Sequence, residues 1–537
     1  MVERTSEQAT PRERQSSRAA FIVFVVVLVF AVPYVLFGVG SYHWFFRDDF
    51  FFITNRNATS VNDLFRPYDG HWTTVPVLIF RTLWALFGLR TYVPYQASVL
   101  ALHLGACALL RVIMRRAGVG PWIATAAAST FILFGPGQEN IIWAFQVGFT
   151  GSLTWGLAQL VLADHDGPVD KRDAFGIAAG ALALLSSGVG IAMAIVAGMA
   201  ILGRRGWKAA LLHTAPLGAA YIIWWSIEHP QLTAPLGRPS VGVTFRWIKS
   251  SEIGVFLALG RYQIVAALLA VVFVIGLVLA WSPLGWSGLR RLASTPIAMV
   301  VGAVVFAGFT AASRWYLGSE FARSSRYLYI GTALTLPALA VAVNAILRRR
   351  REVGIAALAL LVVAIPWNAT HFDQNSVFGK NYMKSRKQIL TNVVRLPEAR
   401  EVPRDVRPIA DVYVGPDLTI GFLLDAEKAG KLKAATGPIS PQLEGELIVK
   451  IGVAQDTGGA PTDCRQLSRT LEIKPAKGTV YSIMTPVTIS RRNSAGQWSP
   501  PVSFNPIDGS TLTIELRGLD LRLAPGRTGS FTLCSIA

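Results

Sequence analysis

The stretch FIVFVVVLVFAVPYVLFGVG, residues 21–40, contains no charged side chain over 20 residues. At ~1.5 Å per residue, an α-helix of this length extends about 30 Å, which matches the hydrocarbon thickness of a bilayer. The stretch is too long for the apolar core of a signal peptide, and no small-residue cleavage site follows it. We therefore expect a retained first transmembrane helix, preceded by a cytoplasmic tail at residues 1–19.

Composition and charge place the whole chain in the same class. Of its 537 residues, 52% are hydrophobic and 15% are charged, whereas a soluble chain carries about 25% charged residues. Much of the net charge of +19 lies in short clusters beside apolar stretches, such as Arg115/Arg116, Arg204/Arg205 and RRRR at 348–351. Because basic clusters on the cytoplasmic side orient membrane proteins, we expect a multi-pass membrane protein with no nucleic-acid partner.

The stretch TTVPVLIFRTLWALFGL, residues 73–89, decides the expected topology. It carries Arg81 at its centre, and if it crossed the membrane, every later basic cluster would face outward. An amphipathic helix lying in the interface keeps those clusters cytoplasmic. We therefore predict one outer loop at residues 41–93 that contains the interfacial helix 73–89.

The remaining apolar stretches bring the expected number of transmembrane helices to about eleven, which leaves the C-terminus outside. The two short stretches around LLSSGVG, residues 184–190, could instead form a re-entrant hairpin. The ten spans expected after the first are residues 94–115, 119–134, 147–163, 174–186, 189–203, 209–226, 262–281, 295–312, 327–347 and 353–367.

Residues 371–537 lack long apolar runs and are predicted to form an extracytoplasmic β-rich domain. Short alternating segments between Gly, Pro and Asp indicate an antiparallel β-sandwich, preceded by a helical connector at 381–396. Cys464 and Cys534 both lie here, and a disulfide between them would suit an oxidising compartment; two unpaired thiols are the alternative. The segments that carry the strand pattern are GELIVKIGVA (445–454), TVYSIMTPVTIS (479–490), STLTIELRGL (510–519) and GSFTLC (529–534).

Polar residues that suit group transfer from a lipid phosphate gather in the predicted outer loops. Acids come from the early loops and arginines from the late ones. A carboxylate beside a hydroxyl can act as general base, and arginines bind a phosphate through two hydrogen bonds and stabilise it as a leaving group. The residues concerned are Asp48, Asp49 and His71 in the first loop, Gln138, Glu139 and Trp143 in GPGQENIIWAFQ (135–146), and Arg261, Arg314, Arg323 and Arg326 later.

Each of these features also has a structural interpretation. Asp48 could pair with Arg47 at the interface, GQEN (137–140) could be a capped turn, and the late arginines could contact lipid head groups. His71 is as consistent with a structural role as with an active one. The spacing of four aspartates resembles a metal site, but they lie in a basic cytoplasmic loop and a solvated turn is the better interpretation; they are Asp164, Asp166, Asp170 and Asp173.

The order of these features resembles the GT-C superfamily of polyprenyl-phosphate-sugar-dependent membrane glycosyltransferases. The features are a first span, an acidic pair in FFRDDFFF (45–52), an interfacial helix, a second acidic loop at GQEN (137–140), many spans and an outer C-terminal domain. The superfamily includes protein O-mannosyltransferases and actinobacterial arabinofuranosyltransferases. The chain is most similar to the actinobacterial members, and this resemblance implies a location in the bacterial inner (plasma) membrane. The resemblance implies a GT-C-like catalytic domain at residues 20–370, with polyprenyl-phosphate sugar as the donor.

The resemblance also implies roles for individual residues. Asp48 or Asp49 would be the catalytic base of an inverting transferase that moves a sugar, such as arabinofuranose or mannose, to a glycan, lipid or protein hydroxyl at the outer face. Glu139, with Gln138, His71 and Trp143, would bind the acceptor. The donor phosphate would be bound by the four late arginines, namely Arg261, Arg314, Arg323 and Arg326.

No cofactor is expected. The chain has no P-loop, no G-x-G-x-x-G before a helix, no H-E-x-x-H and no C-x-x-C, and no metal is predicted, although some GT-C enzymes use a divalent ion. The alternatives to a transferase are a lipid-linked saccharide flippase or transporter and a glycan polymerase. A transporter should carry ionisable groups near mid-span, whereas the polar residues here cluster at one face.

Overall fold

The described part of the chain forms two compact units. The helical unit comprises Met1–His43, Asn57–Ile79 and Val93–Gly379, and the β-containing unit comprises Trp44–Arg56, Phe80–Tyr92 and Lys380–Ala537. Two segments of the predicted outer loop 41–93 thus belong to the β-containing unit. The computed structural model describes residues 10–228, 237–370, 372, 379–400, 402–409, 418–451, 453–455, 461–474, 479–483, 485–492, 496–504, 512–516, 520–526 and 529–536.

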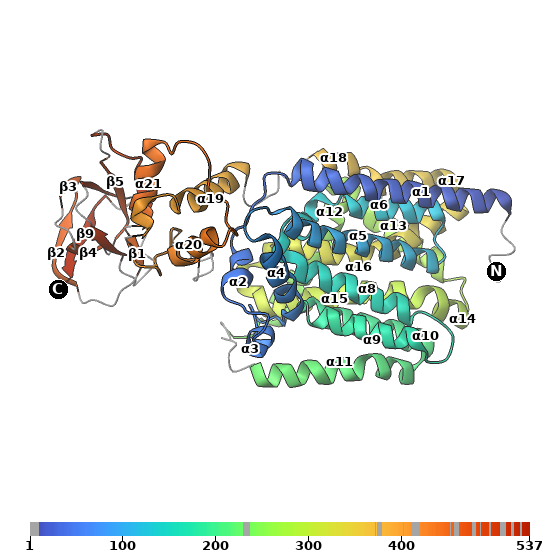
Figure 1. Cartoon of the computed structure of the whole chain (residues 1–537). Coiled ribbons are helices and arrows are strands. Elements are labelled where there is room, and N and C mark those ends of the chain that lie inside the picture. Colours follow the sequence, from blue (N-terminus) through green and yellow to red (C-terminus); the bar gives the residue numbers. More distant parts are fainter. Residues whose placement is uncertain are drawn as a thin grey trace. The chain divides into compact units, whose positions relative to one another are not determined.

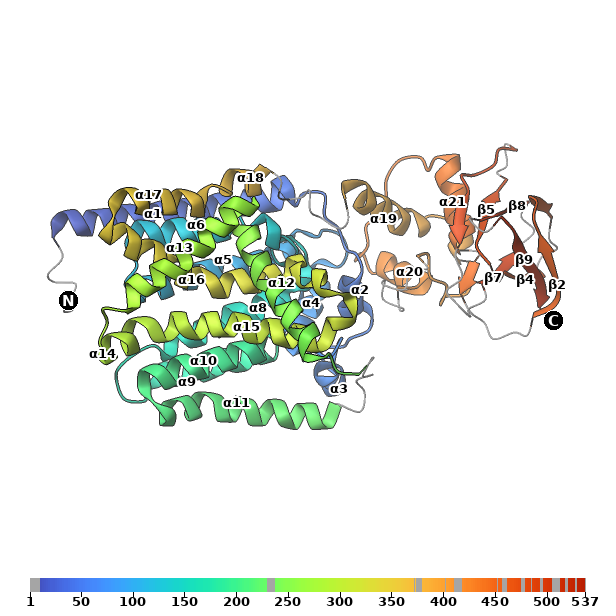
Figure 2. The same cartoon turned by 180° about the vertical axis from the view of Figure 1, so that it is seen from behind.

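The long helices of the helical unit lie side by side with similar axis directions (Figures 1 and 2). α16 is the most buried of the long apolar helices. The helices are α1 (Pro11–Pro33), α3 (Val61–Phe65), α5 (Val93–Arg116), α6 (Pro121–Ile132), α7 (Glu139–Ile142), α8 (Val147–Ala163), α9 (Lys171–Leu184), α10 (Val189–Arg205), α11 (Trp207–Glu228), α12 (Val241–Gly260), α13 (Gln263–Trp281), α14 (Trp286–Gly288), α15 (Ser294–Arg314), α16 (Ser325–Arg349), α17 (Arg351–Val362) and α18 (Ile365–Thr370).

The first helix begins and ends at signals that can be read in the sequence. Thr10 caps α1 through its side chain, Glu13 completes a capping box and Pro11 occupies the first turn. Pro33 cannot donate a backbone hydrogen bond, and a π-helix over Tyr34–Val39 follows it directly. Together they form one long apolar element, Pro11–Val39.

The chain is a helical membrane protein with a small C-terminal sheet region, as predicted, but a count of eleven spans is not supported. Seven helices of the described chain are long and apolar enough to cross a bilayer. Four of the expected spans correspond to α6, α8, α9 and α10, which have 12, 17, 14 and 17 residues. At ~1.5 Å per residue these helices extend about 18–26 Å, less than the hydrocarbon thickness of about 30 Å.

Two further helices bear on the predicted topology. α4 (Thr74–Phe87) has 14 residues, so at about 21 Å it is too short to cross the hydrocarbon. α12 is a 20-residue helix that the sequence analysis did not predict. Its charged residues lower its mean hydropathy, yet it buries Trp247 and Leu259 against the bundle.

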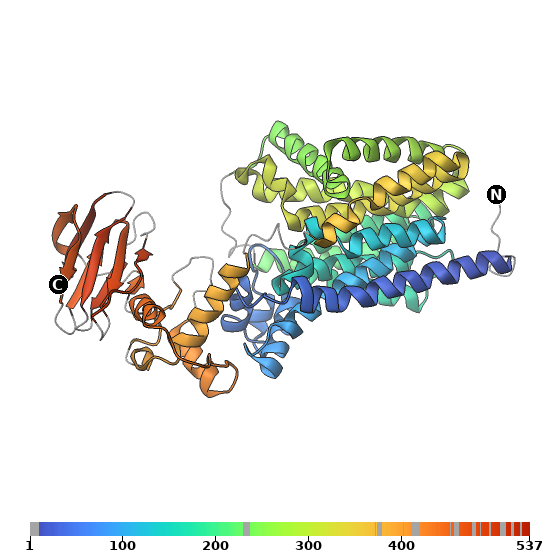
Figure 3. The same cartoon turned by 90° about the horizontal axis from the view of Figure 1, so that it is seen from above.

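The β-containing unit holds two antiparallel sheets, whose strands lie in two layers in Figure 3. The first has the order β1-β7-β4-β9-β2 and the second β3-β8-β5-β6. Side chains of both sheets, including Ile483, Ile489, Leu523 and Phe531, share one core, as a β-sandwich requires. The strands are β1 (Val453–Gln455), β2 (Pro461–Leu467), β3 (Leu471–Ile473), β4 (Thr479–Ile483), β5 (Val487–Arg491), β6 (Val502–Phe504), β7 (Leu512–Leu516), β8 (Leu521–Pro525) and β9 (Phe531–Ile536).

Three of the four predicted strand segments are confirmed, and GELIVKIGVA (445–454) is a correction. Most of it belongs to α21 (Pro441–Ile451), and only its end enters β1. Proline is favourable in the first turn of a helix, and α21 buries Leu447 and Val449 while it packs on β5. The predicted connector forms α19 (Lys380–Val393). The unit also contains α2 (Asp48–Thr54) and α20 (Ile420–Lys428).

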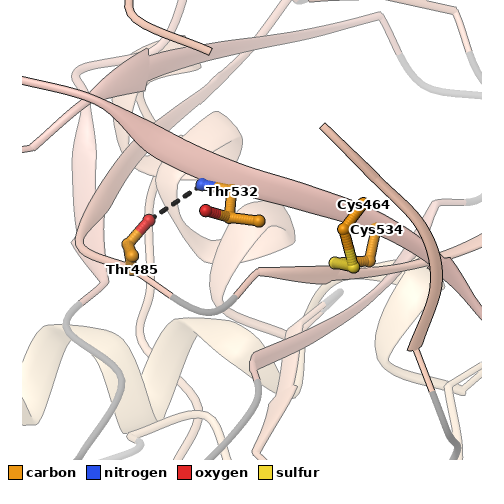
Figure 4. The surroundings of a disulfide bond; sticks show 4 residues. All are labelled: Cys464, Thr485, Thr532 and Cys534. Carbon is orange, nitrogen blue, oxygen red and sulfur yellow. Dashed lines mark hydrogen bonds between the residues drawn. A yellow bond between two sulfur atoms is a disulfide. The ribbon is translucent and has the colours of Figure 1, made fainter. Parts of the chain in front are cut away.

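Cys464 and Cys534 form a disulfide across the neighbouring strands β2 and β9, the first of the two alternatives that the sequence analysis left open (Figure 4). The backbone N–H of Thr532, also on β9, donates to Thr485 Oγ1 at 2.9 Å. Thr485 lies in the connection between β4 and β5, which belong to different sheets. Covalent and hydrogen-bonded links therefore both anchor β9.

Removing this disulfide is expected to destabilise the β-containing unit. The bond closes a loop with a sequence separation of 70, and constraining an unfolded loop of such length stabilises a fold by about 2–4 kcal/mol. In Cys464→Ser/Cys534→Ser, limited proteolysis of the full-length protein should cut the region 453–536 at lower denaturant concentration than in wild type. Cys107→Ser, which leaves the disulfide in place, is the control. Equal protease resistance of the double variant and the wild type would contradict this expectation.

Candidate functional site

The first element of the candidate site is a tight turn, Tyr68–His71, which carries the acidic side chain of Asp69. The backbone groups of Tyr68 and His71 bond to each other, at 3.0 and 2.8 Å. The two central residues, Asp69 and Gly70, have φ angles of +47° and +78°, which is the geometry that favours Asp-Gly in a type I′ turn. Asp69 is 62% exposed and forms an ion pair with Arg314.

A cavity of about 510 Å³ opens beside this turn and is lined mainly by rings; we call it the aromatic cavity. Its polar lining includes Asp69 and His71 on the turn, Tyr327 at the start of α16, and Thr310, Ser313 and Arg314 near the end of α15. The start of α10 closes another side with Gly188 and Val189. Its other aromatic side chains are Phe149, Tyr221, Phe306, Phe309, Trp315 and Tyr316.

His71 is held as a neutral imidazole at the wall of the aromatic cavity. Burial lowers its pKa; the charge of Asp69 opposes this shift, and the charges of Arg314 and Arg326 reinforce it. The N–H of Gly188 donates to His71 Nδ1 at 3.2 Å, so the neutral ring carries its proton on Nε2 and can donate from there. Only glycine fits at 188, because a Cβ would lie 2.7 Å from Nδ1.

A second acid–arginine pair lies next to the aromatic cavity. Arg326 Nε donates to Glu139 Oε2 at 3.1 Å, with the side chains 29% and 17% exposed. The Arg326 guanidinium lies 5.8 Å from the centre of the Trp143 ring. Tyr327, which lines the cavity, interacts electrostatically with Arg326, Glu139, Arg314 and Asp69. The structure thus brings together residues that the sequence analysis drew from three separate loops.

The loop 135–146 also buries three side-chain amides. Gln138, Asn140 and Gln146 are at most 1% exposed. Neither the nitrogen nor the oxygen of any of these amides has a hydrogen-bond partner within the described chain. Burying a polar group without a partner costs about 1–3 kcal/mol, and natural proteins accept such costs mainly at functional sites. The amides therefore mark this loop as a place for polar recognition.

The acidic pair Asp48 and Asp49 forms the first turn of α2, in the β-containing unit. Asp49 is fully buried, and its Oδ2 accepts from Tyr92 OH at 3.1 Å and from the N–H of Phe46 at 3.2 Å. Asp48 is partly exposed. Arg47, immediately before them, has a φ of +47°, a conformation that costs energy for a residue other than glycine and is typical of functional sites. The two aspartates therefore differ in burial.

Of the four predicted phosphate-binding arginines, only Arg314 lines the aromatic cavity. Arg326 lies next to it, and Arg261 and Arg323 have other surroundings. Arg261 caps the end of α12, where its guanidinium lies 3.0 Å from the centre of the Trp367 ring. Arg323 pairs with the exposed Glu320 at 3.0 Å and donates to the carbonyl of Ser250. The roles predicted for both remain predictions.

Sequence analysis missed Asp69, Tyr327 and Gly188 as site residues. The Asp-Gly pair at 69–70 is a turn signal that was visible in the sequence. The positions of Tyr327 and Gly188, in contrast, follow only from the packing of α16 and α10.

The aspartates of the 164–173 loop are paired with basic side chains. The solvated-turn interpretation fits Asp166 and Asp170, but Asp173 is buried and accepts from Arg205 and from His213, the latter at 2.9 Å. Its pKa is lowered, since the bonds from these two residues outweigh the opposing effect of burial. Asp173 also belongs to a group, with His165 and Asp170, whose potential ligand atoms lie within 4.8 Å of one another.

Lowering the pH is expected to destabilise the fold through His43, which precedes the acidic stretch. Burial lowers its pKa from 6.5 to about 4, and neither ring nitrogen has a hydrogen-bond partner among the described residues. Below pH 6.5 His43 takes up a proton in the unfolded chain but stays neutral in the folded chain. The contribution of His43 to the free energy of unfolding is therefore complete above pH 6.5. It falls by about 1 kcal/mol per pH unit from there towards pH 4.

The measurement is the thermal unfolding midpoint of the detergent-solubilised protein between about pH 7 and about pH 5. His43→Phe keeps an aromatic ring in the aromatic stretch but cannot be protonated. Its midpoint should depend less on pH than that of the wild type. Identical pH dependence in the two proteins would show that His43 does not contribute.

Comparisons of the chain with protein families, with curated proteins and with solved structures found no match. The fold and the site define a helical membrane protein that holds paired acids and arginines beside an aromatic cavity.

Proposed function

We propose that the protein is an inverting glycosyltransferase that moves a sugar from a polyprenyl phosphate to an acceptor hydroxyl at the outer face of the bacterial plasma membrane. The observation that supports this most directly is the pair of arginines at one aromatic cavity of about 510 Å³. Arg314 lines the cavity and pairs with Asp69, while Arg326 lies next to it and pairs with Glu139.

These arginines suit the phosphate of the donor. A guanidinium binds phosphate oxygens through two parallel hydrogen bonds, and Asp69 and Glu139 hold the two guanidinium groups at the cavity. The rings of Tyr327, Phe306 and Trp315 provide surfaces for a sugar and for the first prenyl units. As the bond between the sugar and the phosphate breaks, the arginines stabilise the charge that develops on the departing phosphate.

The acceptor supplies the attacking oxygen, and a carboxylate supplies the base. The acceptor oxygen bonds to the anomeric carbon as the carbon–phosphate oxygen bond breaks, and the electron pair of that bond leaves on polyprenyl phosphate. The acceptor proton passes to the carboxylate, and a single displacement inverts the anomeric configuration. The resemblance to the GT-C superfamily assigns the base to the acidic pair, and we place it on Asp48, which is partly exposed, whereas Asp49 is fully buried.

Neutral donors and acceptors near the aromatic cavity suit an acceptor hydroxyl. His71 can donate from Nε2, and the amides of Gln138, Asn140 and Gln146 can each donate and accept. Trp143, whose ring lies beside Arg326, can pack against a sugar face. A glycan, a lipid or a protein could present such a hydroxyl.

The test is sugar transfer by the purified full-length protein from synthetic polyprenyl-phosphate arabinofuranose and mannose to hydroxyl acceptors. The expected result is one polyprenyl phosphate released for each sugar transferred, with inversion at the anomeric carbon. If the protein instead moves the intact lipid-linked sugar across vesicles without transfer, it is a transporter. Growth of a long glycan on the lipid would indicate a polymerase. Either result would overturn the proposal.

We also propose the finer topology, with eleven spans, a cytoplasmic N-terminus and an outer C-terminal domain. α10 supports it: Val189 at its start lines the aromatic cavity, whereas Arg204 and Arg205 at its end belong to a basic cluster. A 17-residue helix of about 26 Å can separate these two environments across a locally thinned bilayer.

Labelling of single cysteines in intact cells with a membrane-impermeant maleimide should distinguish the two faces. Val61 and Val169 are 72% and 61% exposed, and they lie in the predicted outer loop and in a predicted cytoplasmic loop. Val61→Cys is expected to react in intact cells, and Val169→Cys only after the cells are opened. Labelling of both variants in intact cells would contradict the proposed orientation.

A further inference from the structure

A second cavity, of about 470 Å³, is lined by basic side chains and lies at the other end of α10 from the aromatic cavity. We call it the basic pocket. Its single acidic lining residue is Asp166. The five basic side chains that line it are Arg204, Arg205, Lys208, Arg290 and Arg291.

Two packed helices set the distance between the aromatic cavity and the basic pocket. α10 runs from Val189 at the cavity to Arg205 at the pocket, and it packs against α15. α15 follows a short π-helix, Leu289–Ala293, that holds two of the pocket arginines, and it ends at Arg314 in the cavity. These helices have 17 and 21 residues, so the openings are separated by about 26–32 Å, the thickness of the hydrocarbon core.

Exposed tryptophans place the basic pocket at the depth of lipid head groups. Trp207 is 63% exposed and precedes Lys208, while Trp286 is 76% exposed and precedes Ser287. Both following residues line the pocket. Tryptophan is enriched at the interface between the hydrocarbon and water, so a pocket between two such residues faces phospholipid head groups.

The charges in the basic pocket are only partly neutralised. Arg204 pairs with Asp164 at 2.6 Å, Arg291 pairs with Asp166 at 3.1 Å, and Arg205 pairs with Asp173. Arg290 donates to the carbonyl groups of Gly203 and Arg204 at the end of α10 and keeps its charge. Lys208 forms no ion pair within the described residues, and its ammonium lies 5.7 Å from the centre of the Trp207 ring. The pocket therefore retains net positive charge.

We propose that the basic pocket binds the phosphate of an anionic phospholipid head group. Basic pockets between transmembrane helices on the cytoplasmic side suit such head groups, and the positive-inside expectation puts this end of the bundle on that side. A phospholipid supplies a phosphate at the right depth together with acyl chains for the exposed apolar surface of the neighbouring helix, which includes Leu211 at 54% exposure. This inference does not depend on sugar transfer.

The test is calorimetric titration of the full-length protein in neutral detergent with short-chain phosphatidylglycerol, and with short-chain phosphatidylcholine for comparison. Phosphatidylglycerol is expected to bind at least about tenfold more tightly, since each nearby basic residue strengthens the binding of an anionic lipid by about fivefold. Lys208→Gln/Arg291→Gln should weaken phosphatidylglycerol binding by about 20-fold on the same basis. Arg291 and Asp166 are both nearly half-exposed, so this change should leave the fold intact.

Two further variants, one inside the basic pocket and one outside it, serve as controls. Asp166→Asn removes the one carboxylate lining the basic pocket, so phosphatidylglycerol should bind more tightly, an increase that damage to the fold would not produce. Arg349→Gln/Arg350→Gln removes two exposed charges outside the pocket, and its affinity should match that of wild type. Equal affinity for the two lipids, or an equal loss in the Arg349/Arg350 variant, would overturn the proposal. So would inorganic phosphate competing as well as the lipid, because the occupant would then be free phosphate.

Discussion

Asp48→Asn is expected to lower kcat for sugar transfer by about 10²–10⁴-fold, the contribution of a positioned general base. Asparagine keeps the size and polarity of the side chain but cannot take the acceptor proton. Because Asp48 is partly exposed, the protein should fold normally and still bind the donor. The measurement is the initial rate of transfer at saturating donor, together with the thermal unfolding midpoint.

Asp49→Asn is the matched control for this prediction. Asp49 is buried, and its Oδ2 accepts from Tyr92 OH and from the N–H of Phe46. Asparagine retains an oxygen that can accept both bonds, so we expect the rate to fall by less than about tenfold. The thermal unfolding midpoint should drop, because an amide group replaces the other oxygen of a buried carboxylate. A larger loss in Asp49→Asn than in Asp48→Asn would reverse the assignment of the base. Full activity in both variants with none in Asp69→Asn would move it to Asp69, which lines the aromatic cavity.

Arg326→Gln is expected to lower kcat/KM for the polyprenyl-phosphate donor by about 10²–10³-fold, since it removes charge that stabilises the departing phosphate. Arg326→Lys should recover only part of this loss, because an ammonium keeps the charge but not the two parallel hydrogen bonds of a guanidinium. The measurement is the rate as a function of donor concentration. The affinity for the acceptor should change less than kcat/KM for the donor.

Arg323→Gln is the control, because it removes the same charge three residues away. Arg323 pairs with Glu320, which is 78% exposed, whereas Arg326 pairs with Glu139, which is 17% exposed. An exposed pair of this kind contributes little to stability, so near-normal rates are expected. Equal losses in Arg323→Gln and Arg326→Gln would indicate a general electrostatic effect of the loop and would contradict the specific role of Arg326.

Hydropathy predicted the membrane class, whereas seven helices of the described chain, fewer than the eleven spans expected, are long and apolar enough to cross a bilayer. Long uncharged runs such as residues 21–40 form long helices, because backbone polar groups cannot remain unpaired in hydrocarbon. The same criterion could not distinguish helices that are buried inside the bundle from helices that are long enough to cross it. It also missed α12, whose charged residues lower its mean hydropathy although one face is buried.

Residue types indicated the site better than residue positions did. The acidic loops and late arginines were visible in the sequence, and two of their members, Glu139 and Arg326, form an ion pair. The partner of Arg314 is Asp69, which the sequence analysis did not select as a site residue. Arg323 and Arg326, three residues apart, have different partners because one ends a short helical turn and the other begins α16.

The sequence by itself determined the membrane class and the β-rich end, since these depend on local hydrophobicity and strand periodicity. It left Cys464 and Cys534 either bonded or unpaired, and the structure shows the bond. Only the tertiary structure decided which polar residues meet. The sequence of a helix gives the three or four side chains on each turn, but not the neighbouring helix that each face contacts. The packing of α10, α15 and α16 therefore produces the aromatic cavity, the buried amides of residues 138–146 and the basic pocket. Long-range packing is set by the whole bundle at once, and no local stretch of the sequence contains it.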